Sequence, residues 1–217
     1  MILTREQFQE QQLEGMPPPV EGVSLSGQVV VITGANVGLG FEAAKHFAAR
    51  GPQKLIIVCR NVQKGQDALS RTSQLFFLRF FESPTIEAGI KSDTGFQNIE
   101  LWIADFASFD SVKALKGKID TLERLDILVE NAAILSYDYE ETKDGWESSL
   151  QVNILALAHH IILHLPKLLE TAKNYPETVP RIVVVSSDVH YWAKISPEVV
   201  EAAKPLKFLN VKAQYNP

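Results

Sequence analysis

A glycine-rich segment, VITGANVGLG at residues 31–40, has the composition of an anion-binding turn. It joins an apolar, β-branched run to a stretch whose apolar residues have helical spacing. Glycines at such a junction let the backbone approach a ligand closely, and the unpaired amides at the start of the helix attract negative charge. The expected ligand is a pyrophosphate, which predicts a dinucleotide site at the following residues: Thr33, Gly34, Asn36, Val37, Gly38, Leu39 and Gly40.

The elements that would carry this turn alternate along the chain. Apolar runs predict five strands, and the segments between them predict helices, which is the pattern of βαβ units in a parallel α/β sheet. Strands are expected at 28–33, 54–60, 99–106, 125–131 and 180–187. Helices are expected from the glycines to Gly51 and at about 61–71, 108–123 and 145–173, with Pro166 kinking or splitting the last one. The first helix places on one face Leu39, Phe41, Ala44, Phe47 and Ala48.

Two segments fall outside this alternation. Residues 1–26 are interpreted as an arm, with a capping box between Thr4 and Gln7 and an extended proline linker, so the domain is placed at 27–217. An insertion near 73–88 contains LFFLRFF and is longer than the usual connection in such folds. It is either a surface helix that packs its aromatic side chains on the domain, a contact for a partner or membrane, or an insertion foreign to the fold.

Composition excludes several classes of protein. The net charge is −5 and no basic stripe is present, which argues against a nucleic-acid binder. The single cysteine, Cys59, permits no intrachain disulfide and fits a reducing compartment. The apolar stretch ILALAHHIILHLP is interrupted by histidines and is too short to span a bilayer, and no signal peptide is recognised. We therefore expect a cytoplasmic protein without membrane contact.

Several motifs occur in one order that resembles the short-chain dehydrogenase/reductase family. They are TGANVGLG, the CRN of residues 59–61, Asp105, the ENAA of residues 130–133, Asn153 and Ser187. The combination is similar to the retinol-dehydrogenase-like branch with its fungal members. The resemblance implies a Rossmann-like, doubly wound parallel sheet of about five strands that is incomplete at its C-terminal side. It also implies that Asp105 lies beside the adenine and that Asn131 and Ala132 contact the cofactor.

The choice of cofactor follows from the charge at the end of the second strand. Arg60 stands twenty residues after Gly40, where an acidic residue would bind the ribose hydroxyls of NAD. A guanidinium instead pairs with a 2′-phosphate, so NADP(H) is favoured over NAD, with Asn61 in contact and Lys64 as a possible helper. The alternative is that Arg60 is only a solvated charge at a strand end.

The resemblance implies hydride transfer between the nicotinamide and an alcohol or carbonyl compound. Ser187 would orient the carbonyl oxygen and Asn153 would anchor a water of the proton relay. The family's Tyr-x-x-x-Lys is not found after Ser187, and we expect a truncated or incorrectly spliced product. Two functions stay open: an oxidoreductase, or a catalytically inactive NADP(H)-binding or interaction protein. A homodimer is a possible assembly.

Other candidate groups have simpler interpretations. His160 and His164 have the spacing of a metal pair but no acidic third ligand on their helix face, so no metal is predicted. Cys59 falls within a strand core, where a thiol is usually inert. His190 follows Ser187 without the strand-turn-helix elbow of a hydrolase. Glu130 and Ala133 stand where the family has asparagine and glycine.

Overall fold

The computed structural model describes residues 22–60, 90–91, 93–191 and 193–215, together with Thr4, Gln7 and Glu10. Reciprocal hydrogen bonds, Thr4 N to Gln7 Oε1 at 3.0 Å and Gln7 N to Thr4 Oγ1 at 3.2 Å, confirm the predicted capping box. The predicted helix at 61–71 and the insertion at 73–88 lie outside the described residues.

The described chain forms a parallel sheet of five strands in the order β3-β2-β1-β4-β5. The strands are β1 (Val29–Thr33), β2 (Lys54–Cys59), β3 (Ile99–Ile103), β4 (Ile127–Glu130) and β5 (Arg181–Val184). The chain order reverses between β1 and β4, so the sheet is doubly wound and the carboxyl ends of these two strands flank the switch point. The prediction of a Rossmann-like α/β fold is confirmed.

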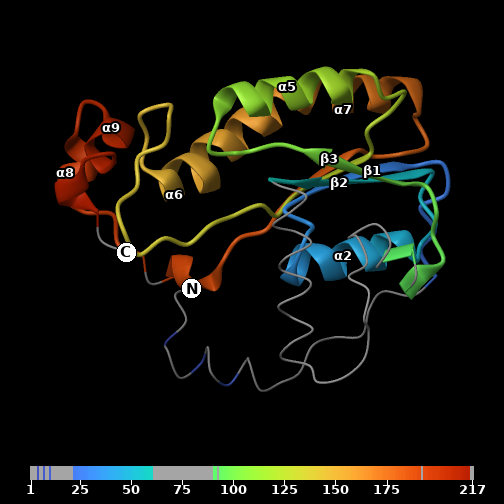
Figure 1. The fold of residues 1–217 in the computed structure, drawn as a ribbon, viewed down its shortest axis with the longest axis horizontal. Helices are drawn as coiled ribbons and strands as arrows, with labels where there is room; N and C mark the ends of the chain where they lie inside the picture. The colour runs from blue at the N-terminus through green and yellow to red at the C-terminus, as the bar shows by residue number, and fades with distance from the viewer. Residues whose placement is uncertain are drawn as a thin grey trace.

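Helices cover both faces of the sheet, α5 (Phe109–Asp120) and α7 (Leu157–Asn174) on one and α2 (Gly38–Ala48) on the other (Figure 1). Alternate residues along the strands point to opposite faces and form two separate hydrophobic clusters. The central strand β1 is buried on both sides, as the burial of all five of its residues shows. This arrangement explains the continuous apolar runs in the sequence.

The long helical segment differs from the prediction at two places. It comprises α6 (Ser148–Leu150), a π-helical turn η1 (Gln151–Ala156) and α7, and α7 continues through Pro166 as one helix. Of the two expected outcomes, a kink or a split, the split at Pro166 is therefore wrong. Pro166 is exposed, and the packing of the neighbouring Leu163 and Leu168 on the core offsets the one backbone hydrogen bond that proline cannot donate.

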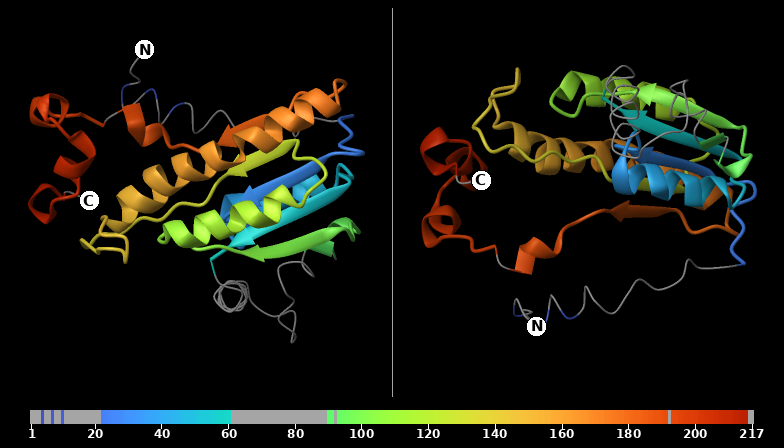
Figure 2. Two further views of the ribbon diagram at one scale, coloured as in Figure 1. Left: turned by 90° about the horizontal axis from the view of Figure 1, so that it is seen from above. Right: turned by 60° about the horizontal axis from the view of Figure 1, so that its bottom comes forward.

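The run Ser148–Asn174 is 27 residues long, with a mean hydropathy of 1.4, and by length and composition alone it is able to cross a membrane. The expectation that this region is too short to do so is corrected, because the helix extends well beyond the apolar segment. In this fold the helix lies over the sheet beside α5 (Figure 2), and its inward side chains, His160, His164 and Leu168, are buried.

The chain beyond the sheet forms short helical turns: η2 (Asp188–Tyr191), α8 (Pro197–Glu201), α9 (Pro205–Leu209) and η3 (Lys212–Gln214). The end of α9 is bonded to the loop before α6, where Asn210 Oδ1 accepts from Glu147 N at 2.6 Å and Tyr139 Oη donates to Asn210 O at 3.0 Å. Within the described residues β5 pairs only with β4, so it forms an edge of the sheet.

Candidate functional site

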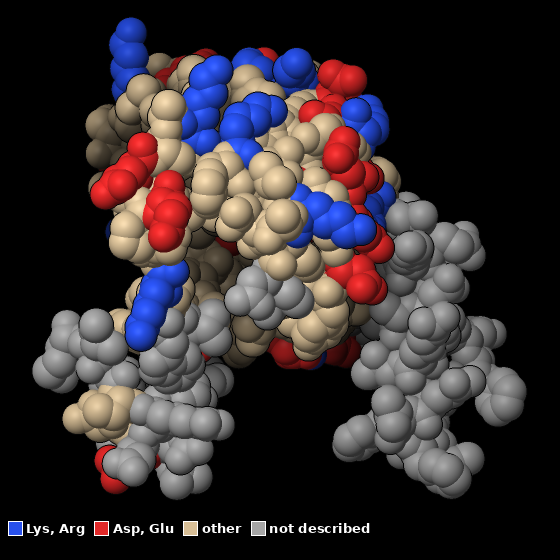
Figure 3. Space-filling model, turned by 90° about the vertical axis from the view of Figure 1, so that its left-hand side faces the viewer, with Lys and Arg blue, Asp and Glu red and all other residues tan. Residues whose placement is uncertain are grey.

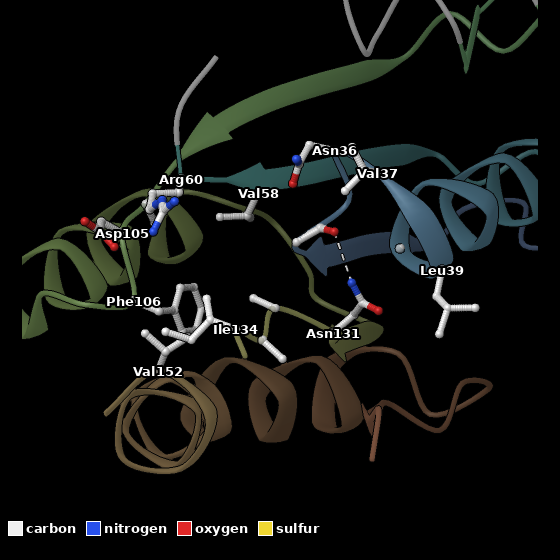
Figure 4. Close-up of a pocket in the computed structure, with 15 residues that line it drawn as sticks. Asn36, Val37, Leu39, Val58, Arg60, Asp105, Phe106, Asn131, Ile134 and Val152 are labelled. Carbon is white, nitrogen blue, oxygen red and sulfur yellow. Dashed lines mark hydrogen bonds between the residues drawn. The ribbon is translucent and has the colours of Figure 1, made fainter. Parts of the chain in front are cut away.

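A cavity of about 420 Å³ opens at the carboxyl ends of the central strands (Figure 4). This is the crevice in which open α/β sheets bind ligands, and its volume is within the range of small-molecule sites, roughly 300 to 1,000 Å³. Its lining consists of Gly34, Asn36, Val37, Leu39, Gly40, Val58, Arg60, Ala104, Asp105, Phe106, Asn131, Ala132, Ala133, Ile134 and Val152.

Most residues proposed from the sequence as cofactor ligands meet around this cavity. Two of the described ones do not line it. Thr33 is fully buried beneath the cavity, and Gly38 is not part of the lining. Asn61 lies outside the described residues. The sequence did not predict the apolar part of the lining, which is Val58, Ala104, Phe106, Ala133, Ile134 and Val152. Val58 lies near the end of β2 and Ala104 follows β3. Their position at the carboxyl ends of predicted strands could have identified them as cavity-lining residues.

Leu39 differs from the sequence prediction in its orientation. It was assigned both to the core face of the first helix and to the cofactor site, but its side chain is 76% exposed and lines the cavity. The core face is made by Phe41, Ala44, Phe47 and Ala48, whereas Leu39 stands in the first turn of α2. The first turn lies at the rim of the cavity, so helical periodicity alone misassigned this residue to the core.

Two glycines are required by close backbone approach. A Cβ on Gly34, which has φ of +65°, would lie 2.8 Å from Ala132 Cα. A Cβ on Gly40 would lie 2.5 Å from Gly34 O and 2.4 Å from Asn131 Nδ2. Real Cβ atoms do not approach other atoms so closely, so glycine is needed to join the first turn of α2 to the ends of β1 and β4.

Asn131 connects the loops after β4 and β1. Its Nδ2 donates to Thr33 O at 3.1 Å and to Gly34 O at 3.0 Å, the second of which is drawn in Figure 4. Both acceptors are backbone carbonyls of the glycine-rich turn. The side chain therefore holds the turn that would bind the pyrophosphate.

Arg60 and Asp105 lie at the same end of the cavity, at the ends of β2 and β3 (Figure 4). The Asp105 carboxylate accepts from Ala107 N at 2.9 Å, and Asp105 N donates to Ser111 Oγ at 2.8 Å. These bonds hold Asp105 in a turn before α5. Arg60 is exposed, which leaves its guanidinium accessible to a ligand at the cavity mouth.

Asn153 does not line the cavity but fixes a residue that does. Its Oδ1 accepts from Ile134 N at 2.9 Å, and its Nδ2 donates to Ile134 O at 2.8 Å. Asn153 lies in the π-helical turn η1, and such turns occur often at functional sites. Asn153 thus anchors the segment after β4 to the long helix.

Comparison with known proteins decides the family. The model of the short chain dehydrogenase family matches residues 28–197. The chain belongs to this family.

Fungal members are among its relatives. A short chain dehydrogenase/reductase of Cryptosporiopsis sp. is 37% identical over 76% of this chain and 46% of its own length. A short-chain dehydrogenase/reductase of Phaeosphaeria nodorum is 34% identical over 88% of this chain and 52% of its own length. The chain thus spans about half the length of these curated relatives.

Solved structures of the family share the fold. A short-chain dehydrogenase from Sphingobium yanoikuyae in complex with NADPH has a TM-score of 0.56 and 23% identity, covering 76% of this chain and 55% of that one. A short chain dehydrogenase from Shigella flexneri has a TM-score of 0.54 and 24% identity, covering 78% of this chain and 59% of that one.

In this family member Ser187 is exposed, and its Oγ lies 3.4 Å from Asp188 Oδ1. It is not among the residues that line the cavity. Tyr215 donates its hydroxyl hydrogen to Ser136 O at 2.7 Å and is likewise outside the lining. Among the described residues that line the cavity, none is a tyrosine, lysine or histidine.

The remaining candidates behave as structural groups. No cluster of three or more metal-ligating side chains exists among the described residues. Cys59 is buried in the sheet core. His160 Nδ1 lies 2.5 Å from Glu130 Oε1, and His164 Nδ1 lies 2.6 Å from His160 O. Each of these two Nδ1 atoms therefore has a partner in the core.

Burial is the main cause that lowers the pKa of His164 to about 4, and the neighbouring His160 adds to the effect. His164 is therefore neutral at pH 7.

Acidic and basic side chains are interspersed on the molecular face shown in Figure 3. The described part of that face carries no continuous basic stripe, which a nucleic-acid backbone would require.

Proposed function

We propose that the chain forms the NADP(H)-binding part of an oxidoreductase that transfers hydride between NADP(H) and an alcohol or carbonyl compound. The observation that carries the proposal is the glycine-lined cavity at the carboxyl ends of the strands. Positions 34 and 40 have no room for a Cβ because loop backbone lies directly against them. A dinucleotide's phosphates would fit such a place, because backbone amides at the start of a helix attract an anion.

Each part of the cofactor has a candidate partner in this cavity. The turn from Gly34 to Gly40 would hold the pyrophosphate, Arg60 the 2′-phosphate and Asp105 the adenine. When bound, the reduced nicotinamide supplies a hydride. Asn153, acting through Ile134, is proposed to shape the nicotinamide end, and Ser187 is proposed to orient a carbonyl oxygen.

A second function is a catalytically inactive NADP(H)-binding or interaction protein. One observation favours it: the described lining offers no tyrosine or lysine, the residues expected to move the proton. A positioned acid or base is worth roughly 10² to 10⁴ in rate, so turnover by this chain alone would be close to background.

Two measurements separate these functions. Fluorescence titration of the purified 217-residue chain with NADPH and with NADH measures binding. A panel of aldehydes and ketones, followed by NADPH absorbance, measures turnover. Binding with turnover supports the oxidoreductase, and binding without turnover supports the inactive form. A folded chain that binds neither nucleotide contradicts NADP(H) binding in both functions and leaves only an interaction protein.

Replacing Arg60 by alanine is expected to weaken NADPH binding about tenfold to 100-fold and NADH binding less than about twofold. A charge-assisted hydrogen bond to phosphate is worth roughly 1.5 to 3 kcal/mol, and about 1.4 kcal/mol corresponds to a factor of ten. The dissociation constants of both nucleotides provide the measurement.

Arg181→Ala is the matched control, because Arg181 is also exposed but begins β5 at the opposite end of the sheet. It should leave both constants unchanged. An equal loss for NADPH and NADH in Arg60→Ala would mean that this arginine does not read the 2′-phosphate.

The proposal also covers the organisation and setting of the chain. Residues 27–217 are assigned to the dinucleotide-binding domain and residues 1–26 to an arm. The buried thiol of Cys59 is consistent with a cytoplasmic protein. A small alcohol or carbonyl compound is the proposed partner, and a homodimer is the proposed assembly.

A further inference from the structure

A buried carboxylate lies directly beneath the glycine-rich turn. Glu130, the last residue of β4, is 1% exposed. Its Oε2 accepts from Thr33 Oγ1 at 3.1 Å, and its Oε1 lies 2.5 Å from His160 Nδ1. Burying a carboxyl group is costly unless its oxygens have polar partners, and each oxygen of Glu130 has one. Glu130 therefore connects the end of β1 with helix α7.

The Thr33 hydroxyl links Glu130 to the backbone of the cavity wall through hydrogen bonds. It accepts hydrogen bonds from Asn131 N at 3.0 Å and from Ala132 N at 3.1 Å. A hydroxyl has one hydrogen and two lone pairs, so a hydrogen directed to Glu130 leaves both lone pairs for these two amides. Val129 O, at 3.3 Å from Thr33 Oγ1, is the competing and longer acceptor.

These amides belong to two residues of the cavity lining. Once the backbone of Asn131 is fixed, its side chain is placed to donate to Thr33 O and Gly34 O. The carboxylate of Glu130 thus acts on the turn through one hydroxyl and two backbone amides, without touching the cavity itself.

His160 orients the carboxylate from the other side. Its ring is fully buried. The ring stands edge-on to Phe106, with 5.3 Å between the ring centroids, and its centroid lies 4.1 Å from that of His164. Phe106 lines the cavity, so the imidazole, which projects from α7, packs on the inner side of the cavity wall. His160 Nε2 has no hydrogen-bond partner within the described part of the chain, so the Nδ1 contact to Glu130 is its anchoring interaction.

We propose that Glu130, held by His160, is a positioning residue for the dinucleotide: it orients the Thr33 hydroxyl so that the Asn131–Ala132 turn keeps its cofactor-binding conformation. This inference rests on the proposed function, because the affected ligand is NADP(H). It assigns a role to the position at which the sequence departs from the family's asparagine.

Two substitutions of Glu130 separate hydrogen bonding from shape. Glu130→Gln keeps an acceptor for Thr33, and its amide can donate to His160 Nδ1 if the imidazole carries its proton on Nε2. Glu130→Leu has a similar size but no acceptor. We expect Glu130→Leu to weaken NADPH binding about tenfold, by the loss of one buried acceptor. Glu130→Gln should restore the dissociation constant to within about twofold of the unmodified chain.

Thr33 provides the test of the route. Thr33→Ser keeps the hydroxyl and should bind NADPH within about twofold of the unmodified chain, whereas Thr33→Val should bind about tenfold more weakly. If Glu130 acts through the hydroxyl, adding Glu130→Leu to Thr33→Val should weaken binding by less than about another twofold. A fully additive loss would show that Glu130 acts in another way and would overturn the inference.

Amide hydrogen exchange gives a readout that does not need the nucleotide. The amides of Asn131 and Ala132 should exchange faster in Thr33→Val than in Thr33→Ser, while amides of α5 keep their rates. Equal exchange in the two Thr33 variants overturns the inference. If Glu130→Leu fails to fold, this comparison still tests the Thr33 step on which the role of Glu130 depends.

The two proposals fail in different ways. A folded, unmodified chain that binds no NADPH contradicts the proposed function, and the exchange rates then still test the positioning role. Binding that is normal in the unmodified chain and within about twofold of normal in folded Glu130→Leu overturns only the role of Glu130.

Discussion

Gly40→Ala is expected to weaken NADPH binding by about 100-fold or more. The added methyl would lie 2.5 Å from Gly34 O and 2.4 Å from Asn131 Nδ2, so the glycine-rich turn and the Asn131 side chain must both move. Overpacking of this kind costs roughly 1 to 3 kcal/mol, and the displaced amides no longer converge on the phosphates. Fluorescence titration measures the affinity, and urea unfolding measures the loss of stability.

Gly117→Ala is the matched control for the same change in composition. Gly117 lies within α5, and a Cβ built on it meets no atom within 4 Å. Alanine there should raise stability by up to about 1 kcal/mol, because glycine is a poor helix former, and should leave NADPH affinity unchanged. If Gly40→Ala binds NADPH as tightly as Gly117→Ala, the turn does not hold the phosphates.

Acidification is expected to remove about 3 kcal/mol of folding stability through His164 alone. Its pKa is about 4 in the folded chain, against an ordinary value of 6.5. The unfolded chain therefore takes up the proton first as the pH falls. The stabilisation is complete above pH 6.5 and is lost between pH 6.5 and 4, and the difference of 2.5 pKa units corresponds to about 3 kcal/mol.

The measurement compares urea unfolding of the unmodified chain and of His164→Asn between pH 8 and pH 4. The asparagine amide can still donate to His160 O but does not titrate, so the variant should lose about 3 kcal/mol less on acidification. His46→Asn, at an exposed position of α2, is the matched histidine-to-asparagine control. Parallel pH profiles for His164→Asn and the unmodified chain would contradict the assignment.

Local sequence patterns were sufficient for much of the fold. Each strand of the sheet was predicted as an apolar run, and the glycine-rich segment predicted the turn between β1 and α2. Gly51, expected to end the first helix, has φ of +63°. These features depend on neighbouring residues: strand burial on both faces, helical periodicity, and glycine's access to positive φ.

Other features depended on contacts between distant segments. Leu39 fits the helical pattern of α2 but projects toward the cavity, because its position at the first turn places it beyond the sheet. Pro166 remains inside α7, because packing of its neighbours on the core outweighs one missing backbone hydrogen bond.

Glu130 is an example within the site of a residue whose type was evident from the sequence but whose partners were not. From the sequence it was a departure from a family motif, at the end of an apolar strand. Its role depends on Thr33, 97 positions earlier, and His160, 30 positions later, which only the assembled sheet and α7 bring to its two oxygens. Sequence thus determined the strands, the turn and the types of group available, because these depend on local steric and hydrophobic preferences. Tertiary structure determined which buried groups meet, because parallel strands and their crossover helices join segments far apart in the chain.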